Sequence, residues 1–147
     1  MQIINTINLN EARKKILEVK KKNSNEKIAL LSQDDEFNRK ALEIKGLSCL
    51  IINEAIYVKD YMKQRNSGLN EVLAKICTDK GIEIGIQIDE IIKKNDADKA
   101  KALARLNQNI LLCKRTKTKL VFISEKNHNK QALNSILLTF KASNQQI

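Results

Sequence analysis

The sequence predicts an α/β protein built on a parallel sheet, and two observations lead to this prediction. Short runs rich in β-branched and aliphatic residues alternate with longer stretches in which apolar residues recur every three or four positions. The runs at residues 47–53 and 119–124 are almost uninterrupted in apolar side chains, which is typical of strands covered on both faces. Strands that alternate with helices indicate parallel pairing through right-handed crossovers.

Five strands and five helices are expected in alternation. The strand-like runs are residues 2–5, 27–32, 47–53, 83–88 and 119–124. The helical faces between and after them are Leu9, Ala12, Ile16 and Val19; Phe37, Ala41 and Ile44; Leu69, Val72, Leu73, Ile76 and Cys77; Ala100, Leu103, Leu106, Ile110 and Leu111; and Leu133, Ile136, Leu137 and Phe140.

Polar residues and glycine mark the expected ends of these helices. Asn8 and Glu11 are placed as a cap and its partner before the first helix, and Ser32 and Asp35 stand in the same relation before the second. Gly81 is placed to end the third helix in the left-handed conformation.

The length limits the architecture to one domain. A chain of 147 residues closes one sizeable core, whereas a complete eightfold barrel usually takes roughly 200 residues or more. We therefore expect an open sheet or a partial, reduced TIM-barrel-like architecture over residues 1–141, followed by a polar C-terminal tail at residues 142–147.

The charge points to an anionic partner. Lys and Arg number 27 against 17 Asp and Glu, a formal net charge of +10, and such an excess favours association with nucleic acid. The alternative is that the lysines merely solvate helices in a protein from an AT-rich genome. Four cations cluster before the last strand and four lie in the middle of the chain. The candidate RNA-binding residues are Arg39, Lys40, Lys63, Arg65, Lys114, Arg115, Lys117 and Lys119.

Cysteine usage and apolar runs indicate a reducing, cytoplasmic setting. The three cysteines, Cys49, Cys77 and Cys113, are odd in number and lack CxxC spacing, so buried free thiols are expected. The N-terminal residues do not resemble a signal peptide, and no apolar run approaches the ~20 residues needed to cross a bilayer, so no membrane association is expected.

Catalytic groups are sparse. Strand ends carry Asp34, Glu54, Asp89, Glu125 and the single histidine, His128, which in principle could hold a metal in a small barrel-type phosphoesterase. The aspartates are instead predicted to cap helices, and His128 to be an exposed loop residue. The chain contains neither a GxSxG elbow nor a phosphate-binding glycine motif. We expect no catalytic residue, no metal site and no cofactor.

The run Asn66-Ser67-Gly68-Leu69-Asn70 is a loop motif of another kind. Asn66 or Ser67 is placed to cap the helix that follows, and Gly68 permits a tight turn. The helix N-terminus could also bind one phosphate. With only three Phe and two Tyr in the chain, phosphate contacts rather than base stacking are expected to dominate RNA binding.

Two segments resemble a known family. Residues 64–75 (Gln-Arg-Asn-Ser-Gly-Leu-Asn-Glu-Val-Leu-Ala-Lys) are similar to an Arg/Lys-Asp-Ser-Gly-Leu-Asn-His-Val-Leu-Ala segment of archaeal ribonuclease P protein component 3. Residues 35–43 (Asp-Glu-Phe-Asn-Arg-Lys-Ala-Leu-Glu) resemble that family's Asp-Glu-x-Asn-Arg-x-Ala-x-Glu stretch. Asn66 and Glu71 depart from the pattern, where the family has Asp and His. The opening strand and helix units of the family are also missing, so the resemblance is to a form shortened at the N-terminus.

The resemblance implies a PHP-like barrel without a metal centre, in an accessory subunit that is not an enzyme by itself. The RNA of ribonuclease P removes the 5′ leader of tRNA precursors, so the implied partners are that RNA, precursor tRNA and ribonuclease P protein component 2, with Mg²⁺ required by the RNA. The motif positions implied to contact RNA or shape the loop are Arg39, Arg65, Ser67, Gly68 and Asn70. A generic basic RNA-binding module and the phosphoesterase remain the alternatives.

Overall fold

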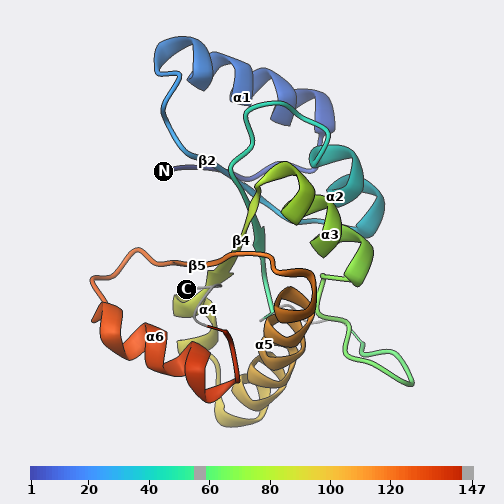
Figure 1. Cartoon of the computed structure of the whole chain (residues 1–147), viewed down its shortest axis with the longest axis vertical. Helices are drawn as coiled ribbons and strands as arrows, with labels where there is room; N and C mark the ends of the chain where they lie inside the picture. Colours follow the sequence, from blue (N-terminus) through green and yellow to red (C-terminus); the bar gives the residue numbers. More distant parts are fainter. Residues whose placement is uncertain (55–58, 144–147) are drawn as a thin grey trace.

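The computed structural model describes residues 1–54 and 59–143, and within them strands alternate with helices as predicted, except that two helices rather than one lie between the last two strands (Figure 1). The strands are β1 (Gln2–Ile4), β2 (Ile28–Leu31), β3 (Cys49–Ile52), β4 (Glu83–Gln87) and β5 (Leu120–Ile123). The helices are α1 (Leu9–Lys22), α2 (Asp35–Ala41), α3 (Glu71–Lys80), α4 (Ile88–Ile92), α5 (Asp96–Thr116) and α6 (Lys130–Thr139).

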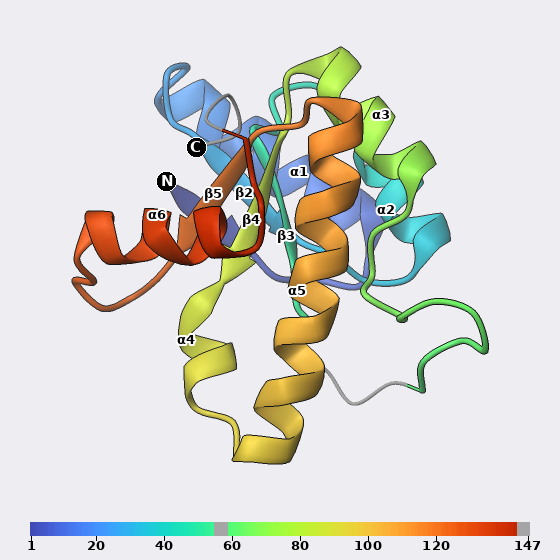
Figure 2. The ribbon, with the colours of Figure 1, turned by 60° about the horizontal axis from the view of Figure 1, so that its bottom comes forward.

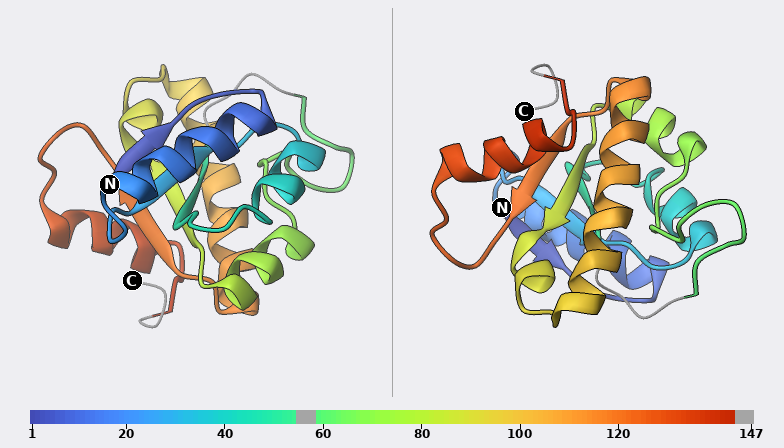
Figure 3. Two further views of the ribbon diagram at one scale, coloured as in Figure 1. Left: turned by 90° about the horizontal axis from the view of Figure 1, so that it is seen from above. Right: turned by 90° about the horizontal axis from the view of Figure 1, so that it is seen from below.

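The strands form one parallel sheet in the order β1-β2-β3-β4-β5, so the predicted fold class is confirmed. This sequential order is the order of a TIM-type barrel, and right-handed crossovers then place the helices on one face of the sheet. In the part of the chain that is described, β1 pairs only with β2 and β5 only with β4. Figure 3 shows the helices arranged around the sheet in views from above and below.

The pleat divides the strand residues between two faces. The residues on the helix side belong to the main core: Ile4, Ile28, Leu30, Leu50, Ile52, Ile84, Ile86 and Leu120. The residues that alternate with them along the strands lie on the opposite face, where Ala29, Cys49 and Ile51 form a smaller cluster with Leu31, Val121 and Ile123 packed against it. Because both faces of the central strands are covered by apolar groups, the sequence runs there are nearly continuous in apolar residues.

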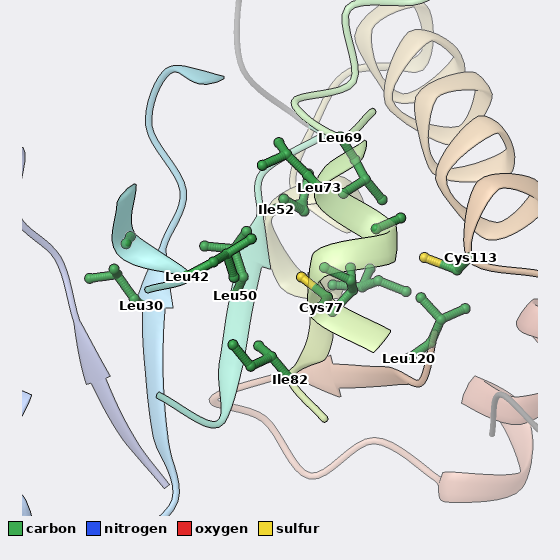
Figure 4. Packing of buried hydrophobic residues seen from close by; sticks show 14 of the residues in the cluster. Leu30, Leu42, Leu50, Ile52, Leu69, Leu73, Cys77, Ile82, Cys113 and Leu120 are labelled. Atoms are coloured by element: carbon green, nitrogen blue, oxygen red, sulfur yellow. The ribbon is translucent and has the colours of Figure 1, made fainter. Parts of the chain in front are cut away.

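The main core is built from the apolar stripes of the helices on the first face. Figure 4 shows Leu73 and Cys77 of α3 lying between Leu50 and Ile52 of β3 and the side chain of Cys113 on α5. All three cysteines are buried and free, and burial raises the pKa of each thiol to about 12. The thiols therefore act as small apolar core groups rather than as nucleophiles.

The helix starts correct part of the sequence interpretation. Asn8 caps α1 as predicted. The cap of α2 is Asp34, as the capping interpretation of the aspartates predicted, and not Ser32 of the Ser32–Asp35 pair. The cap of α3 is Asn70, whose side chain accepts a hydrogen bond from the backbone N–H of Leu73, so neither Asn66 nor Ser67 caps this helix. Val72, which was expected on the buried face of α3, is 59% exposed, because the buried face of this helix consists of Leu73, Ala74 and Cys77.

Gly81 ends α3 in the left-handed conformation, as predicted. No helix of the described residues is both long and apolar enough to cross a membrane. Ala142 is buried against the core, whereas residues 144–147 of the expected tail lie outside the described residues, so the domain boundary at residue 141 stays a prediction.

Gly85 is the residue of β4 that packs against the smaller cluster. A Cβ atom at this position would stand 2.9 Å from Cys49 Sγ, 3.0 Å from Ile123 Cγ1 and 3.1 Å from Ile51 Cγ1. These side chains close over the glycine, so the strand has no room for a methyl group there.

We therefore predict that Gly85→Ala lowers the free energy of unfolding by about 1–3 kcal/mol through overpacking, as measured by urea denaturation. Removing the nearest atom in the double variant Gly85→Ala/Cys49→Ala should recover part of this loss, giving a favourable coupling energy in a double-mutant cycle. Strictly additive losses would show that crowding against Cys49 is not the cause.

Candidate nucleic-acid interface

The eight cations predicted to bind RNA all have exposed side chains, and they lie in three places. Arg39 and Lys40 are on α2, and Lys63 and Arg65 are in the segment that precedes α3, which we call the 59–70 loop. The remaining four, Lys114, Arg115, Lys117 and Lys119, lie at the end of α5 and before β5. Lys40 forms an exposed i,i+4 ion pair with Glu36 at 2.6 Å, a type of pair that contributes little stability.

The structure brings two of the three places together. Arg65 of the 59–70 loop and both Lys114 and Arg115 of α5 line one hollow of about 570 Å³. Arg39 instead lines a hollow between the starts of α2 and α3, together with Asp35 and Glu71. These three residues belong to the two segments that resemble the family, and the Asn70 side chain donates a hydrogen bond to Asp35 Oδ2 over 3.4 Å. The two segments are therefore neighbours in space.

The 59–70 loop is held in place by one face of α5. Figure 2 shows this loop beside the helix, projecting from the body of the protein. Gln108 receives a hydrogen bond from the backbone N–H of Arg65 and donates to the Arg65 carbonyl, both over 3.0 Å. Its amide also donates to Ser67 Oγ over 3.0 Å. One glutamine thus holds the backbone of Arg65 and the side chain of Ser67, the two neighbours of Asn66.

Asp60 ties the loop to α5 by charge. Its carboxylate accepts hydrogen bonds from the backbone N–H of Asn66 at 2.8 Å, from Arg65 at 3.0 Å and from Arg105 at 3.1 Å. Partial desolvation opposes ionisation, but these donors prevail and lower the pKa of Asp60 to about 2. Asp60 is therefore ionised at neutral pH. Its negative charge partly neutralises the positive charge of Arg65.

The loop motif shapes the chain rather than presenting every residue to solvent. Ser67 is buried, and its hydroxyl donates to the Leu69 carbonyl. Gly68 has φ of +75°, a conformation that L side chains rarely adopt, and the chain bends there. Asn66 donates from its side chain to the Lys59 carbonyl over 3.3 Å. The motif therefore determines the backbone conformation between Arg65 and the start of α3.

A buried acid–amide pair lies beneath this loop. Glu54, after the end of β3, is 1% exposed, and its Oε1 accepts a hydrogen bond from Asn109 Nδ2 over 3.1 Å. The same nitrogen donates to the Ser67 carbonyl over 3.3 Å. Among the described residues, Glu54 Oε2 and Asn109 Oδ1 have no hydrogen-bond partner. Burial raises the pKa of Glu54 to about 7, against the smaller opposing effect of its hydrogen bonds.

A proton on Glu54 Oε2 would supply the hydrogen-bond donor that Glu54 Oε2 and Asn109 Oδ1 both lack. A protonated carboxyl group facing a carboxamide donates its O–H to the amide oxygen while accepting the amide N–H. Leaving two buried acceptors unpaired costs about 1–3 kcal/mol each, so the neutral acid is the form that this environment favours. The sequence interpretation placed Glu54 among possible metal-binding carboxylates, whereas the structure places it inside the protein against α5.

His128 lies in a loop, as predicted, but it is partly buried rather than exposed. Its Nε2 lies 2.6 Å from Asp89 Oδ1. The other oxygen of Asp89 accepts hydrogen bonds from Ser124 Oγ and from the backbone N–H of Glu125. The bonds from His128 and Ser124 hold the pKa of Asp89 well below its usual range. Asp89 does lie in the first turn of α4, as expected, but it also joins α4 to the loop after β5.

The strand-end carboxylates do not converge on one point. Asp34 caps α2, Glu54 is buried against Asn109, and Asp89 is engaged by His128 and Ser124. Across residues 1–54 and 59–143, no three His, Cys, Asp or Glu side chains are grouped so that they could hold a metal ion.

The residues missed by sequence reasoning are those on the polar face of α5. Arg105, Gln108 and Asn109 stand at the i, i+3 and i+4 positions of the helix, next to the buried residues Leu106 and Ile110. A polar stripe inside an apolar helical face is the sequence feature that could have indicated a buried contact with a polar loop.

These elements define a singly wound parallel α/β protein with an exposed basic surface. No family model matches the chain. It is similar to ribonuclease P protein component 3 of Methanococcus vannielii, with 28% identity over 108 residues that cover 74% of this chain and 44% of that protein. The resemblance found in the two segments is therefore confirmed by a curated relative, although the chain spans less than half of the relative's length.

A solved structure has the same fold. A chain in the cryo-EM structure of archaeal ribonuclease P with mature tRNA superposes with a TM-score of 0.68 at 20% sequence identity. The match covers 95% of this chain and 61% of that one. It establishes the arrangement of strands and helices.

We predict that Glu54 makes stability depend on pH. The ordinary pKa of this carboxyl is 4.5 and its pKa in the folded protein is about 7, so the folded state holds the proton more tightly. Its contribution to the free energy of unfolding is full below about pH 4.5, falls as the pH rises to about 7, and is constant above that. Over this range the loss is on the order of 3 kcal/mol.

Glu54→Gln tests this, because glutamine imitates the neutral acid and does not titrate. The difference in unfolding free energy between parent and variant should change between pH 4.5 and pH 8, while Glu43→Gln, which alters an exposed carboxyl, should track the parent. If the parent and Glu54→Gln show the same pH profile, Glu54 is not protonated in the fold.

Proposed function

We propose that this protein is a non-catalytic subunit of ribonuclease P that binds and stabilises the catalytic RNA during removal of the tRNA 5′ leader. The observation that carries the proposal is the meeting of the two family-like segments, 35–43 and 64–75, through the Asn70–Asp35 hydrogen bond and a shared hollow. The similarity to ribonuclease P protein component 3 covers 74% of the chain and supports the same assignment.

The proposed mechanism is electrostatic. RNA phosphates repel one another when the RNA folds, and protein cations placed along the backbone lower that cost by displacing counterions. Arg65, Lys114 and Arg115 line one hollow from two sides and would hold a phosphate segment between the loop and α5. The RNA and its Mg²⁺ supply the chemistry, so the protein needs no nucleophile, metal or cofactor of its own.

The protein partner that we propose is ribonuclease P protein component 2, in the cytoplasm. The edge strands β1 and β5 each pair on one side only within the described residues, and a partner is one means of covering such edges. The phosphoesterase alternative lacks a supporting observation, because the carboxylates that it needs are engaged in separate hydrogen bonds. A generic basic module would bind RNA without preference for the ribonuclease P RNA, and sequencing the RNA that co-purifies with the protein separates the two.

We predict that the four cations near the end of α5 contribute directly to RNA affinity. Changing Lys114, Arg115, Lys117 and Lys119 together to Gln should weaken binding to the ribonuclease P RNA. The slope of log K against log salt concentration should become shallower by about 0.7–0.9 for each phosphate that the protein no longer neutralises, as measured by filter binding at a series of salt concentrations.

The matched control removes the same charge elsewhere. Arg13, Lys14, Lys21 and Lys22 of α1 are exposed and likewise comprise one arginine and three lysines. Their replacement by Gln should reduce the salt dependence less than replacement of the α5 group. Equal effects of the two quadruple variants would mean that net charge alone drives binding and that the α5 group is not part of a site.

A further inference from the structure

A second hollow lies at the carboxyl ends of the first three strands. It has a volume of about 620 Å³ and is enclosed by the residues after β1, β2 and β3 and by the 59–70 loop. The residues that matter for its chemistry are Asn5, Gln33, Asp34, Asp35, Asn53 and Tyr61. A space of this size lies within the range of small-ligand sites, and the ends of parallel strands are where such sites form.

The charge inside this hollow is opposite to that of the whole protein. Within the described part of the chain, the charged side chains that line it are Asp34 and Asp35, and no lysine or arginine contributes to its wall. A phosphate group is therefore repelled from its interior. Cations stand on the surrounding elements instead: Arg39 lines the neighbouring hollow that shares Asp35, and Arg65 precedes Asn66, a residue of the wall. This arrangement suits a nucleotide whose base enters while its phosphates stay outside.

The polar groups of the wall match the edge of a base. Amide side chains such as Gln33 and Asn5 both donate and accept, and carboxylates accept from exocyclic amino groups. Gln33 is held by its backbone, because the buried Asn38 accepts from its N–H over 2.8 Å and donates to its carbonyl over 3.2 Å. Within the described residues, the side chains of Asn5 and Gln33 form no hydrogen bond that would compete with a ligand.

Apolar surface for stacking is present at the same place. Tyr61 is 58% exposed and Ile7 is 83% exposed, although both line the hollow. An unpaired base covers such surface by stacking on an aromatic ring, the contact by which single-strand binders hold bases. The chain has few aromatic residues, so one stacking position fits the sequence whereas a row of them does not.

We propose that this hollow takes one unpaired RNA base that carries an exocyclic amino group, adenine, cytosine or guanine, stacked on Tyr61 with its edge at Gln33 and the carboxylates of Asp34 and Asp35. Uracil is disfavoured because it has no exocyclic amino group to donate to these carboxylates. The inference rests on the proposed RNA-binding function and names the part of the RNA that this site reads.

The test compares the oligonucleotides rA₆, rC₆ and rU₆ in binding to the full chain at low salt, by fluorescence anisotropy and by NMR of the side-chain amides. We expect rA₆ or rC₆ to bind at least fivefold more tightly than rU₆ and to shift the Gln33 side-chain amide signals, which rU₆ should leave in place. The double variant Gln33→Ala/Tyr61→Ala should reduce the preference to within twofold while rU₆ affinity stays unchanged.

Controls separate the base site from general RNA binding. Met62→Ala/Gln64→Ala alters exposed residues of the same loop that do not line the hollow, and it should keep the preference. Equal binding of all three oligonucleotides by the parent overturns the base site but leaves the proposed function standing, whereas failure of all three to bind speaks against the proposed function as well. Broadening of Asp34 and Asp35 signals by micromolar Mn²⁺ in the absence of RNA would identify a cation site and overturn the base site.

Discussion

The hydrogen bonds of Asn109 are the interaction on which the candidate interface depends. Its side-chain nitrogen joins Glu54, which follows the central strand β3, to the Ser67 carbonyl of the 59–70 loop. Asn109 itself stands on α5, whose neighbouring residues Leu106 and Ile110 are fully buried in the main core. The loop is thus fixed relative to both the sheet and the longest helix. An unpaired buried carboxylate at this point would disturb all three parts together.

The sequential strand order explains why the polar contacts gather where they do. Because all the strands run parallel, their carboxyl ends lie at the same edge of the sheet, and the loops after β1, β2 and β3 meet there. Asp35 takes part in both hollows at this edge, while Arg65 connects the loop to the basic end of α5. The topology therefore places Asp34 and Asp35 inside the hollow at the strand ends and the cations on the elements around it, although the chain as a whole is strongly basic.

Local patterns predicted the fold well, because strands and helices are local in origin. The five strands of the described residues lie inside the predicted runs, since their apolar side chains are needed on both faces of the sheet. The caps were predicted only in part. Two candidates, Ser32 and Asp34, were available for α2 and Asp34 is the cap, whereas Asn70 caps α3 in place of Asn66 or Ser67, because several neighbouring polar residues are equally good caps.

Long-range polar pairs were not predicted from the sequence. Glu54 and Asn109 are separated by 55 residues and His128 and Asp89 by 39, so no local pattern connects either pair. The cations on α2, in the loop and after α5 could be identified by type. Arg65 shares a hollow with Lys114 and Arg115 because Gln108 holds the loop against the helix. This contact is visible only in the folded structure.

Reconstitution of ribonuclease P measures the central claim most directly. Cleavage of precursor tRNA by the cognate RNA and its other proteins would be followed as Mg²⁺ is lowered, with and without this chain. If the chain stabilises the RNA fold by phosphate neutralisation, adding it raises the cleavage rate at least tenfold at low Mg²⁺, with little effect at high Mg²⁺ and the same cleavage site throughout. Rates that do not depend on the chain at any Mg²⁺ concentration would contradict this role.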